Sequence, residues 1–459
     1  MKKKESDFLK FFNRHFHVII YCAYFIILSF LTFQAGLNTL LQIPGISSEQ
    51  YRILEAADNI LQGKLPSPGY QGSPLYTACT ALAAYLSYGT LSIMRIIFIS
   101  VYSFIPVYVY KLTRRLRFGR ENAQIAAFMY SLYGAAAVCS VNFFPEPFIS
   151  LLFLLYLYFL HKAVMRKFCL HARWGAAVTA AGCIASEISM ILPVVLPFLF
   201  ICFFTPAGKR IPTRYWIRPL LISGIISAPF LYYGIAAEPH FSLSLRSSSP
   251  FLLSSFEQPG EISYYVYSDI IEFMRIFIVP FTLPMILALT ACLLGKRRST
   301  ALFFIISALF PFFLIVALSA SSQSTRIPAL PLLCILSGGA VYLIRTMKSK
   351  SAALIAATAA ACYVWYTYIP PDSARSAADK RFTATVLTRS GRYEKAGKYL
   401  ERLESEGIPA TGEWFILIRT VARTGDVQWA LELESTFIKY FRKRTKHKLI
   451  IPIDPWKNR

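Results

Sequence analysis

A small number of acidic side chains in this sequence stand where they could do chemistry. The 459 residues include only 24 Asp and Glu against 48 Lys and Arg. Three of the acids, Glu49, Asp58 and Glu146, lie between long apolar stretches. An ionisable group at the edge of a membrane is costly and often marks function. A carboxylate placed there can accept a proton from a hydroxyl or an amine as a new bond forms.

These acids also have plainer interpretations. Glu49 could stabilise the start of a helix that begins at Gln50. Glu146 stands between two prolines in FFPEPF. It could bind a cation, orient an acceptor, pair with Arg326, or occupy an ordinary turn at the interface. We group Asp58 with Glu146 for the orienting role.

One cation and one aromatic loop complete the set of candidates. Arg326 follows the polar stretch SASSQST and begins an apolar one. A fixed guanidinium there could bind a phosphate that leaves during a reaction, or it could anchor the chain to lipid headgroups. His240, Tyr264 and Tyr265 lie between the apolar stretches and could line a groove for an acceptor. Tyrosines in such places more often form an interfacial belt.

Membrane helices must position these side chains. Hydrophobic residues make up 55% of the chain, charged residues make up 16%, and the mean hydropathy is +0.48. Soluble proteins carry about 25% charged residues. We therefore predict an all-α polytopic membrane protein with eleven helices that each cross about 30 Å of hydrocarbon. They fall near positions 17–36, 90–111, 122–142, 147–163, 217–236, 268–294, 301–319, 327–345 and 352–369, with two more within 174–205.

The basic residues decide the orientation of these helices. The net charge of +24 is gathered in short clusters between the apolar stretches, not in one stripe, which argues against a nucleic-acid partner. Segment 174–205 could form one long helix or two short helices broken around Glu187. Only the two-helix alternative puts every basic cluster on one side, as the positive-inside rule requires. The N-terminus is then cytoplasmic, and the segment after Pro370 is extracytoplasmic.

Two parts of the chain outside the membrane have their own patterns. In the outer loop 37–89, apolar residues at helical spacing before Gly63 predict an interfacial helix. In the tail 371–459, Gly391 and Gly425 are 34 residues apart, and so are Ala396 and Ala430. This period resembles the tetratricopeptide repeat, in which a glycine lies at the turn and an alanine where two helices touch. A generic pair of helical hairpins is the alternative.

Four stretches, in order, resemble one enzyme group. They are EQYRILEAADNILQGK with GSPLY, then FFPEPFISLLFLLYLYFL, GCIASEISMILPVVLPFL and STRIPALPLLCILSGGAVYLI. Together they resemble the GT-C superfamily of membrane glycosyltransferases, which includes protein O-mannosyltransferases and aminoarabinose transferases. The resemblance covers about positions 10–370, so we expect a GT-C-like domain at 1–370 and a tetratricopeptide-like tail at 371–459.

The resemblance implies a function and a set of roles. Such enzymes move a sugar from a polyprenyl-phosphate carrier to an extracytoplasmic acceptor, here at the inner membrane of a bacterium. Glu49 stands where the group usually has a catalytic Asp, so the resemblance assigns it the role of base. Arg326 would contact the donor phosphate. Glu187 departs from the group, which often has a cation near this position.

Other functions remain open at this point. A transporter or flippase of lipid-linked intermediates would have ionisable residues along the middle of several helices and repeats between its halves, and neither is visible. A non-catalytic scaffold that acts through its tail is the third hypothesis, with a protein partner bound at 371–459. No cofactor is certain, and a divalent metal stays open because Glu49 and Glu146 are the strongest candidate ligands.

Overall fold

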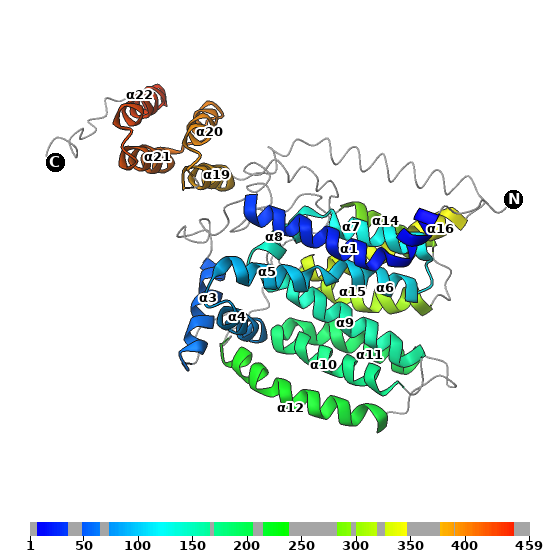
Figure 1. Ribbon diagram of the computed structural model, residues 1–459. Coiled ribbons are helices and arrows are strands. Elements are labelled where there is room, and N and C mark those ends of the chain that lie inside the picture. The colour runs from blue at the N-terminus through cyan, green and yellow to red at the C-terminus, as the bar shows by residue number, and fades with distance from the viewer. Residues whose placement is uncertain are drawn as a thin grey trace. The chain divides into compact units, whose positions relative to one another are not determined.

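The computed structural model describes ten stretches of the chain, and every regular element in them is a helix (Figure 1). The prediction of an all-helical protein is therefore confirmed for this part of the chain. The helices form two compact units, the first made from 1–38 and 47–374, the second from 39–46 and 375–459. The described residues are 7–34, 48–64, 73–165, 169–204, 214–237, 282–294, 300–318, 326–346, 377–389 and 391–444.

The first unit is a bundle of apolar helices. Its elements are α1 (Asp7–Gln34), α3 (Ser48–Leu61), α4 (Pro74–Leu86), α5 (Leu91–Tyr102), α6 (Phe104–Arg115), α7 (Arg120–Ser131), α8 (Gly134–Val141), α9 (Glu146–Met165), α10 (Leu170–Ser186), the short η1 (Ile188–Met190), α11 (Ile191–Phe204), α12 (Arg214–Ala237), α14 (Thr282–Leu294), α15 (Thr300–Leu318) and α16 (Arg326–Thr346).

Several of these helices are long and apolar enough to cross a membrane. Within the described residues there are four such spans, or up to five if a bent pair counts as one. The four are Phe11–Thr32, Leu91–Arg115, Glu146–Met165 and Ile327–Arg345. Shorter apolar helices occupy Ile191–Phe203, Trp216–Phe230, Leu283–Cys292 and Leu302–Phe312. The chain is thus a multi-pass membrane protein. The number eleven stays a prediction, since the expected span at 352–369 and the first half of 268–294 lie outside the described residues.

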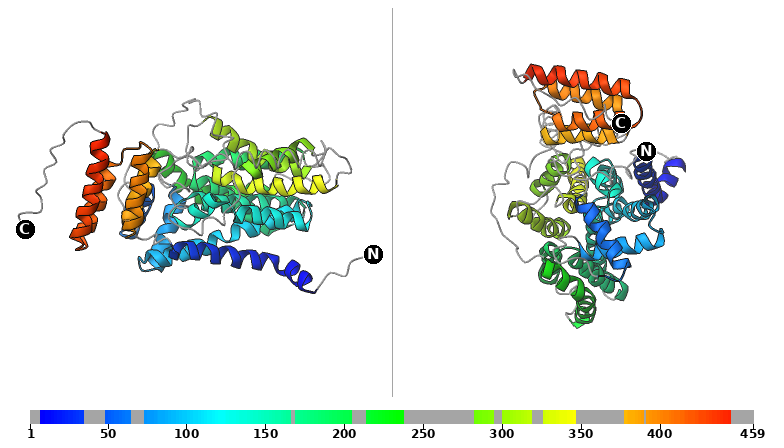
Figure 2. Two further views of the ribbon diagram at one scale, coloured as in Figure 1. Left: turned by 90° about the horizontal axis from the view of Figure 1, so that it is seen from above. Right: turned by 90° about the vertical axis from the view of Figure 1, so that its left-hand side faces the viewer.

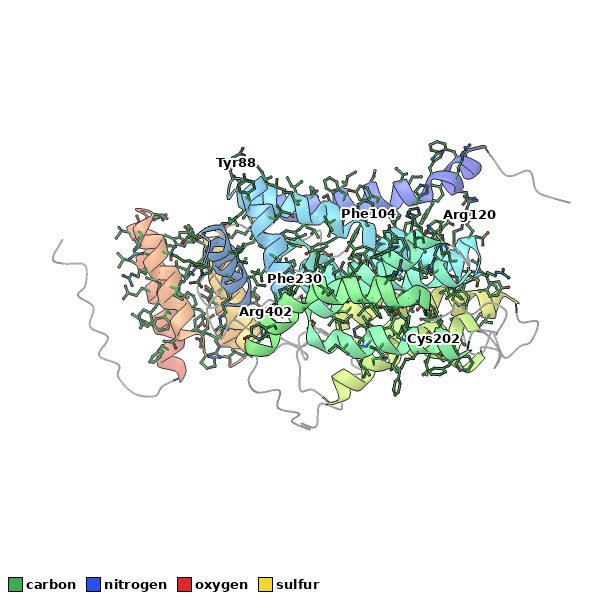
Figure 3. All side chains as sticks on the ribbon, turned by 90° about the horizontal axis from the view of Figure 1, so that it is seen from below. Tyr88, Phe104, Arg120, Cys202, Phe230 and Arg402 are labelled. Atoms are coloured by element: carbon green, nitrogen blue, oxygen red, sulfur yellow. The ribbon has the colours of Figure 1, made fainter. Side chains whose placement is uncertain are left out.

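Large apolar side chains cover the outer surface of the bundle. Ile225 is 71% exposed, Phe203 is 67% exposed and Ile26 is 64% exposed. Tyr88 is 97% exposed and projects from the edge of the bundle in Figure 3. Such side chains would cost free energy in water and none in hydrocarbon. This surface therefore fits a lipid environment.

Two breaks in the helices bear on the predicted spans. Position 187 divides 174–205 into α10 and α11, because Glu187 has an extended backbone (φ −157°, ψ 127°) that no helix accommodates. The two-helix alternative is thus confirmed. The stretch 122–142 was expected as one straight helix and is instead α7 and α8, which meet at a bend of 60°. The bend follows from Tyr133, whose extended backbone ends one helix before Gly134 begins the next.

Helix α9 is central to the packing of the unit (Figure 1). It contacts α6, α10 and α16. Gly175 of α10 lets the Phe159 ring of α9 approach so closely that an added Cβ would lie 2.8 Å from it. The Tyr156 hydroxyl donates to the Val194 carbonyl oxygen of α11 at 2.7 Å. These close contacts fix the second half of α9 against α10 and α11.

The predicted interfacial helix of the first outer loop is α3. It packs on α4 through Ile53, Ala56 and Ala57, which are buried. It ends before Gly63, whose φ of +73° suits glycine because that backbone region is strained for other residues. The side chain of Asp58 points into solvent, where it accepts a hydrogen bond of 2.7 Å from Gln62.

The described residues of the second unit form four helices, drawn in orange to red in Figure 2. They are α19 (Ala377–Arg389), α20 (Tyr393–Ser405), α21 (Thr411–Arg423) and α22 (Val427–Arg444). Gly391 and Gly425 have φ values of +75° and +94° and lie in the turns of the two hairpins. Ala396 and Ala430 are both buried. The repeated pattern thus corresponds to two helical hairpins, and the assignment to the tetratricopeptide family stays a prediction.

Candidate functional site

Glu146 is the predicted site residue whose surroundings the structure describes best. It begins α9, and Pro147 follows it in the first turn, where a missing backbone N–H costs nothing. The Ser150 hydroxyl donates to the Glu146 carbonyl oxygen at 2.7 Å, and the Ile149 amide donates to the Pro145 carbonyl oxygen at 3.0 Å. The residue is only 6% exposed. The FFPEPF segment therefore directs a carboxylate into the interior instead of leaving it in a surface turn.

Two other helices, α4 and α5, carry further buried polar side chains near Glu146. Tyr76 comes from α4, and Arg95 and Tyr102 come from α5, which contacts both α4 and α9. Tyr76 and Tyr102 are fully buried, and Arg95 is 1% exposed. The Tyr102 hydroxyl lies beside that of Tyr76 and within electrostatic reach of Glu146. We call Tyr76, Arg95, Tyr102 and Glu146 the polar cluster.

Aromatic rings form the frame of the polar cluster. The Arg95 guanidinium carbon lies 5.5 Å from the centroid of the Phe143 ring, three residues before Glu146. Phe98 packs edge-on against Phe143 with centroids 5.8 Å apart, and its centroid is 5.4 Å from that of Tyr76. A cation over an aromatic face gains more when it is shielded from water. The rings thus help to retain a guanidinium that would otherwise be costly to bury.

The polar cluster combines groups that suit chemistry on hydroxyl-bearing substrates. A buried carboxylate can accept a hydrogen bond or a proton, and the first turn of α9 favours its negative charge. Phenol hydroxyls can donate and accept, and a guanidinium can bind carboxylate or phosphate through several N–H groups. Burial of a carboxylate and a guanidinium in one cluster also limits the cost of each charge. Binding of a sugar or of a phosphate is within the means of these four side chains.

The other predicted site residues are not brought into this cluster by any described contact. Glu49 lies in the first turn of α3 and Arg326 begins α16, but their side chains lie outside the described part of the structure. Asp58 is exposed on α3. His240, Tyr264 and Tyr265 fall in the stretch 238–281, which is also outside the described residues. Among the described side chains, no group of three or more His, Cys, Asp or Glu could hold a metal ion.

One departure found in the sequence has a structural counterpart. Glu187, where the GT-C group often has a cation, lies exposed in the break between α10 and α11 and accepts a hydrogen bond from Ser189. In the second unit, Lys380 is 8% exposed, and its Nζ lies 2.7 Å from the Glu406 carboxylate.

Sequence analysis missed three members of the polar cluster. Arg95 had a usable signal, since it is the one charged residue in the apolar stretch from 90 to 110. Tyr76 belongs to the GSPLY segment but had been taken only as part of a resemblance. Tyr102 had no signal, because tyrosines at the ends of membrane helices are common.

Solved structures of known proteins include some that are similar to this chain. No protein-family model matches the sequence, and no curated protein matches it. The structure of ArnT from Cupriavidus metallidurans bound to undecaprenyl phosphate has 15% identity and a TM-score of 0.43, over 89% of this chain and 76% of that chain. The apo structure of the same protein has 15% identity and a TM-score of 0.44, over 86% and 76%.

Proposed function

We propose that this chain is a GT-C-like glycosyltransferase that moves a sugar from a polyprenyl-phosphate donor to an extracytoplasmic lipid, glycan or protein. The observation that carries the proposal is the burial of the Glu146 carboxylate, 6% exposed, among phenols and a guanidinium. FFPEPF supplies Glu146 and GSPLY supplies Tyr76, and both segments resemble the GT-C group. Segments about 70 positions apart thus contribute to one polar cluster, as parts of a shared site would.

The proposed reaction is a direct displacement. The acceptor hydroxyl or amine attacks the anomeric carbon, the bond from that carbon to the phosphate oxygen breaks, and the polyprenyl phosphate leaves with the electron pair. The proton of the acceptor passes to a carboxylate. We assign that base to Glu49 from the resemblance, and we assign Glu146 the orientation of the acceptor or of a cation. Arg326, together with Arg95, would stabilise the charge that develops on the phosphate.

Carboxylate-to-amide substitutions test these assignments. Glu49→Gln should lower transfer by about a hundredfold or more, because a general base contributes about 10²- to 10⁴-fold. Glu146→Gln should lower it by about tenfold or more, since one buried charged hydrogen bond is lost. Glu55→Gln is the control, because Glu55 is exposed on α3 and carries the same group. The assay follows labelled sugar from polyprenyl-phosphate donors into lipid, glycan and protein fractions.

The outcomes separate the proposal from its alternatives. Undiminished transfer in both variants would remove these carboxylates from the mechanism. If no donor supports transfer by the wild-type chain but the chain moves lipid-linked sugars across vesicles, it is a transporter or flippase. If it does neither and a tail deletion alone abolishes assembly of the envelope, it is a scaffold.

The proposal includes a location and an orientation. We place the chain in the inner membrane with a cytoplasmic N-terminus and an extracytoplasmic tail, because the basic clusters then share the cytoplasmic side. The tail would bind the acceptor or a partner protein. Single cysteines introduced on α20 and on the loop after α6, in a cysteine-free background, should react with an impermeant reagent in intact cells only at α20. The reverse pattern would overturn the orientation.

A further inference from the structure

The end of α9 opposite Glu146 carries a second group of buried and charged side chains. A rise of about 1.5 Å per residue separates Glu146 from His161 by about 22 Å along the helix axis. His161 is 9% exposed, and its ring centroid lies 6.0 Å from that of Phe304 in α15. Its Nδ1 atom has no hydrogen-bond partner among the described residues. A buried polar atom in this condition usually indicates a partner that is not part of the chain.

Two arginines at the end of α6 face His161. Arg115 and Arg117 are both within electrostatic reach of the imidazole. The Arg115 Nη2 atom donates to the Tyr158 hydroxyl at 3.0 Å, and its guanidinium carbon lies 4.4 Å from the centre of that ring. Tyr158 is on α9, one turn before His161. The guanidinium of Arg115 is thus held in place beside the histidine by a neutral partner.

The charges of these arginines are not compensated within the described structure. Neither Arg115 nor Arg117 forms an ion pair with a described carboxylate. The nearest acid in the sequence, Glu121, pairs instead with Arg345 at 2.5 Å. Two cations without a described carboxylate partner, beside an imidazole whose Nδ1 atom has no described partner, attract an anion that can accept several hydrogen bonds. A phosphate group has the charge and the oxygen atoms for this role.

We infer that Arg115, Arg117 and His161 bind a phosphate group at the basic end of α9, separately from the polar cluster. Arg115 and Arg117 supply the charge, and an imidazole N–H of His161 donates to one phosphate oxygen. The phosphate can belong to an anionic phospholipid or be free phosphate. Non-specific attraction of the two arginines to lipid headgroups would not explain why the buried His161 has an Nδ1 atom without a partner among the described residues.

A matched pair of substitutions tests this site. Arg115→Gln should weaken binding of phosphatidylglycerol by about tenfold, because a charged hydrogen bond is worth about 1.5–3 kcal/mol. Arg114→Gln removes the same charge one position earlier. Arg114 is exposed and contacts Tyr110 instead, at 3.4 Å, so its loss should change binding by about twofold at most. His161→Phe keeps both arginines and the bulk of the ring, and should weaken binding by about fivefold.

The measurement uses the purified, delipidated full chain and native mass spectrometry. Titration with phosphatidylglycerol should give one bound lipid per chain, and phosphatidylcholine should give none. Inorganic phosphate at millimolar concentration is added in a second arm. If it displaces the phosphatidylglycerol, free phosphate is a ligand of the site, and if it does not, the ligand is the lipid. Equal losses in Arg114→Gln and Arg115→Gln, or full binding in His161→Phe, would overturn the inference.

Discussion

A single methyl group added at Gly338 should destabilise the bundle. Gly338 lies in α16, where α16 crosses α7 and α6. A Cβ atom there would lie 2.7 Å from the backbone carbonyl oxygen of Asn122, 3.2 Å from the Ala126 Cβ and 3.3 Å from the Thr113 Cγ2. Carbon and oxygen do not approach so closely without strain, and a backbone oxygen cannot rotate away. The helices must therefore separate.

The magnitude follows from two opposing effects. Overpacking in a close contact costs about 1–3 kcal/mol. Alanine is favoured over glycine within a helix by about 1 kcal/mol, which offsets part of that cost. We expect Gly338→Ala to lose up to about 2 kcal/mol of stability in detergent. Gly224→Ala in α12 is the control, because nothing lies within 4 Å of an added Cβ there, and it should be neutral or slightly stabilising.

Thermal unfolding of the two variants, followed by circular dichroism at 222 nm in one detergent, compares these effects directly. The wild-type chain provides the reference midpoint. Equal unfolding midpoints for Gly338→Ala and Gly224→Ala would show that the contact between α16 and α7 accommodates a methyl group. The argument from close packing would then be wrong.

Further predictions concern the second unit of the chain. Trp414→Ala should destabilise that unit by about 3–5 kcal/mol, because Trp414 is fully buried. Phe415→Ala should have little effect, because Phe415 is 51% exposed. Hydrogen exchange of the α21 amides measures the stability of both variants. The pKa of Glu406 is lowered, chiefly by its hydrogen bond to Lys380. Ionised Glu406 therefore stabilises the folded unit. This stabilisation is fully present above the pKa of an unfolded glutamate, about 4.3, and is lost as the pH falls through the lower pKa that Glu406 has in the folded unit. Lys380→Met should therefore speed hydrogen exchange of the α19 amides at pH 7, and it should reduce the difference in their protection between pH 7 and pH 3. Lys398→Met removes an exposed ion pair and should change neither the exchange rate nor that difference. An equal effect of the two lysine substitutions would contradict the role of the buried one.

Much of the helical organisation could be predicted because it depends on local pattern. Apolar length predicted the spans that α1, α9 and α16 form, and the polar interruption at Glu187 predicted the break between α10 and α11. The repeated glycines predicted the turns at Gly391 and Gly425, since both require a positive φ. In each case the deciding interaction lies within a few residues of the chain.

The bend of 60° between α7 and α8 could not be predicted in this way. The stretch 122–142 is mostly apolar and contains no charged residue and no proline. Its apolar length predicted one helix that spans the membrane. With the bend, Ala136 and Ala137 are fully buried among neighbouring helices. The free energy of that burial depends on the other helices, so it cannot be read from the sequence of this stretch alone.

The sequence by itself determined that this chain is a helical membrane protein, the approximate bounds of α9, α12, α15 and α16, and the choice of Glu146 as a candidate site residue. Only the tertiary structure decided that the buried side chains of Tyr76, Arg95 and Tyr102 lie near Glu146, and that Arg115 and Arg117 lie near His161. The physical reason is that hydrophobicity and backbone preference act along the chain and report only the average environment of a segment. Which side of each helix meets which neighbour depends on close packing between segments far apart in the sequence.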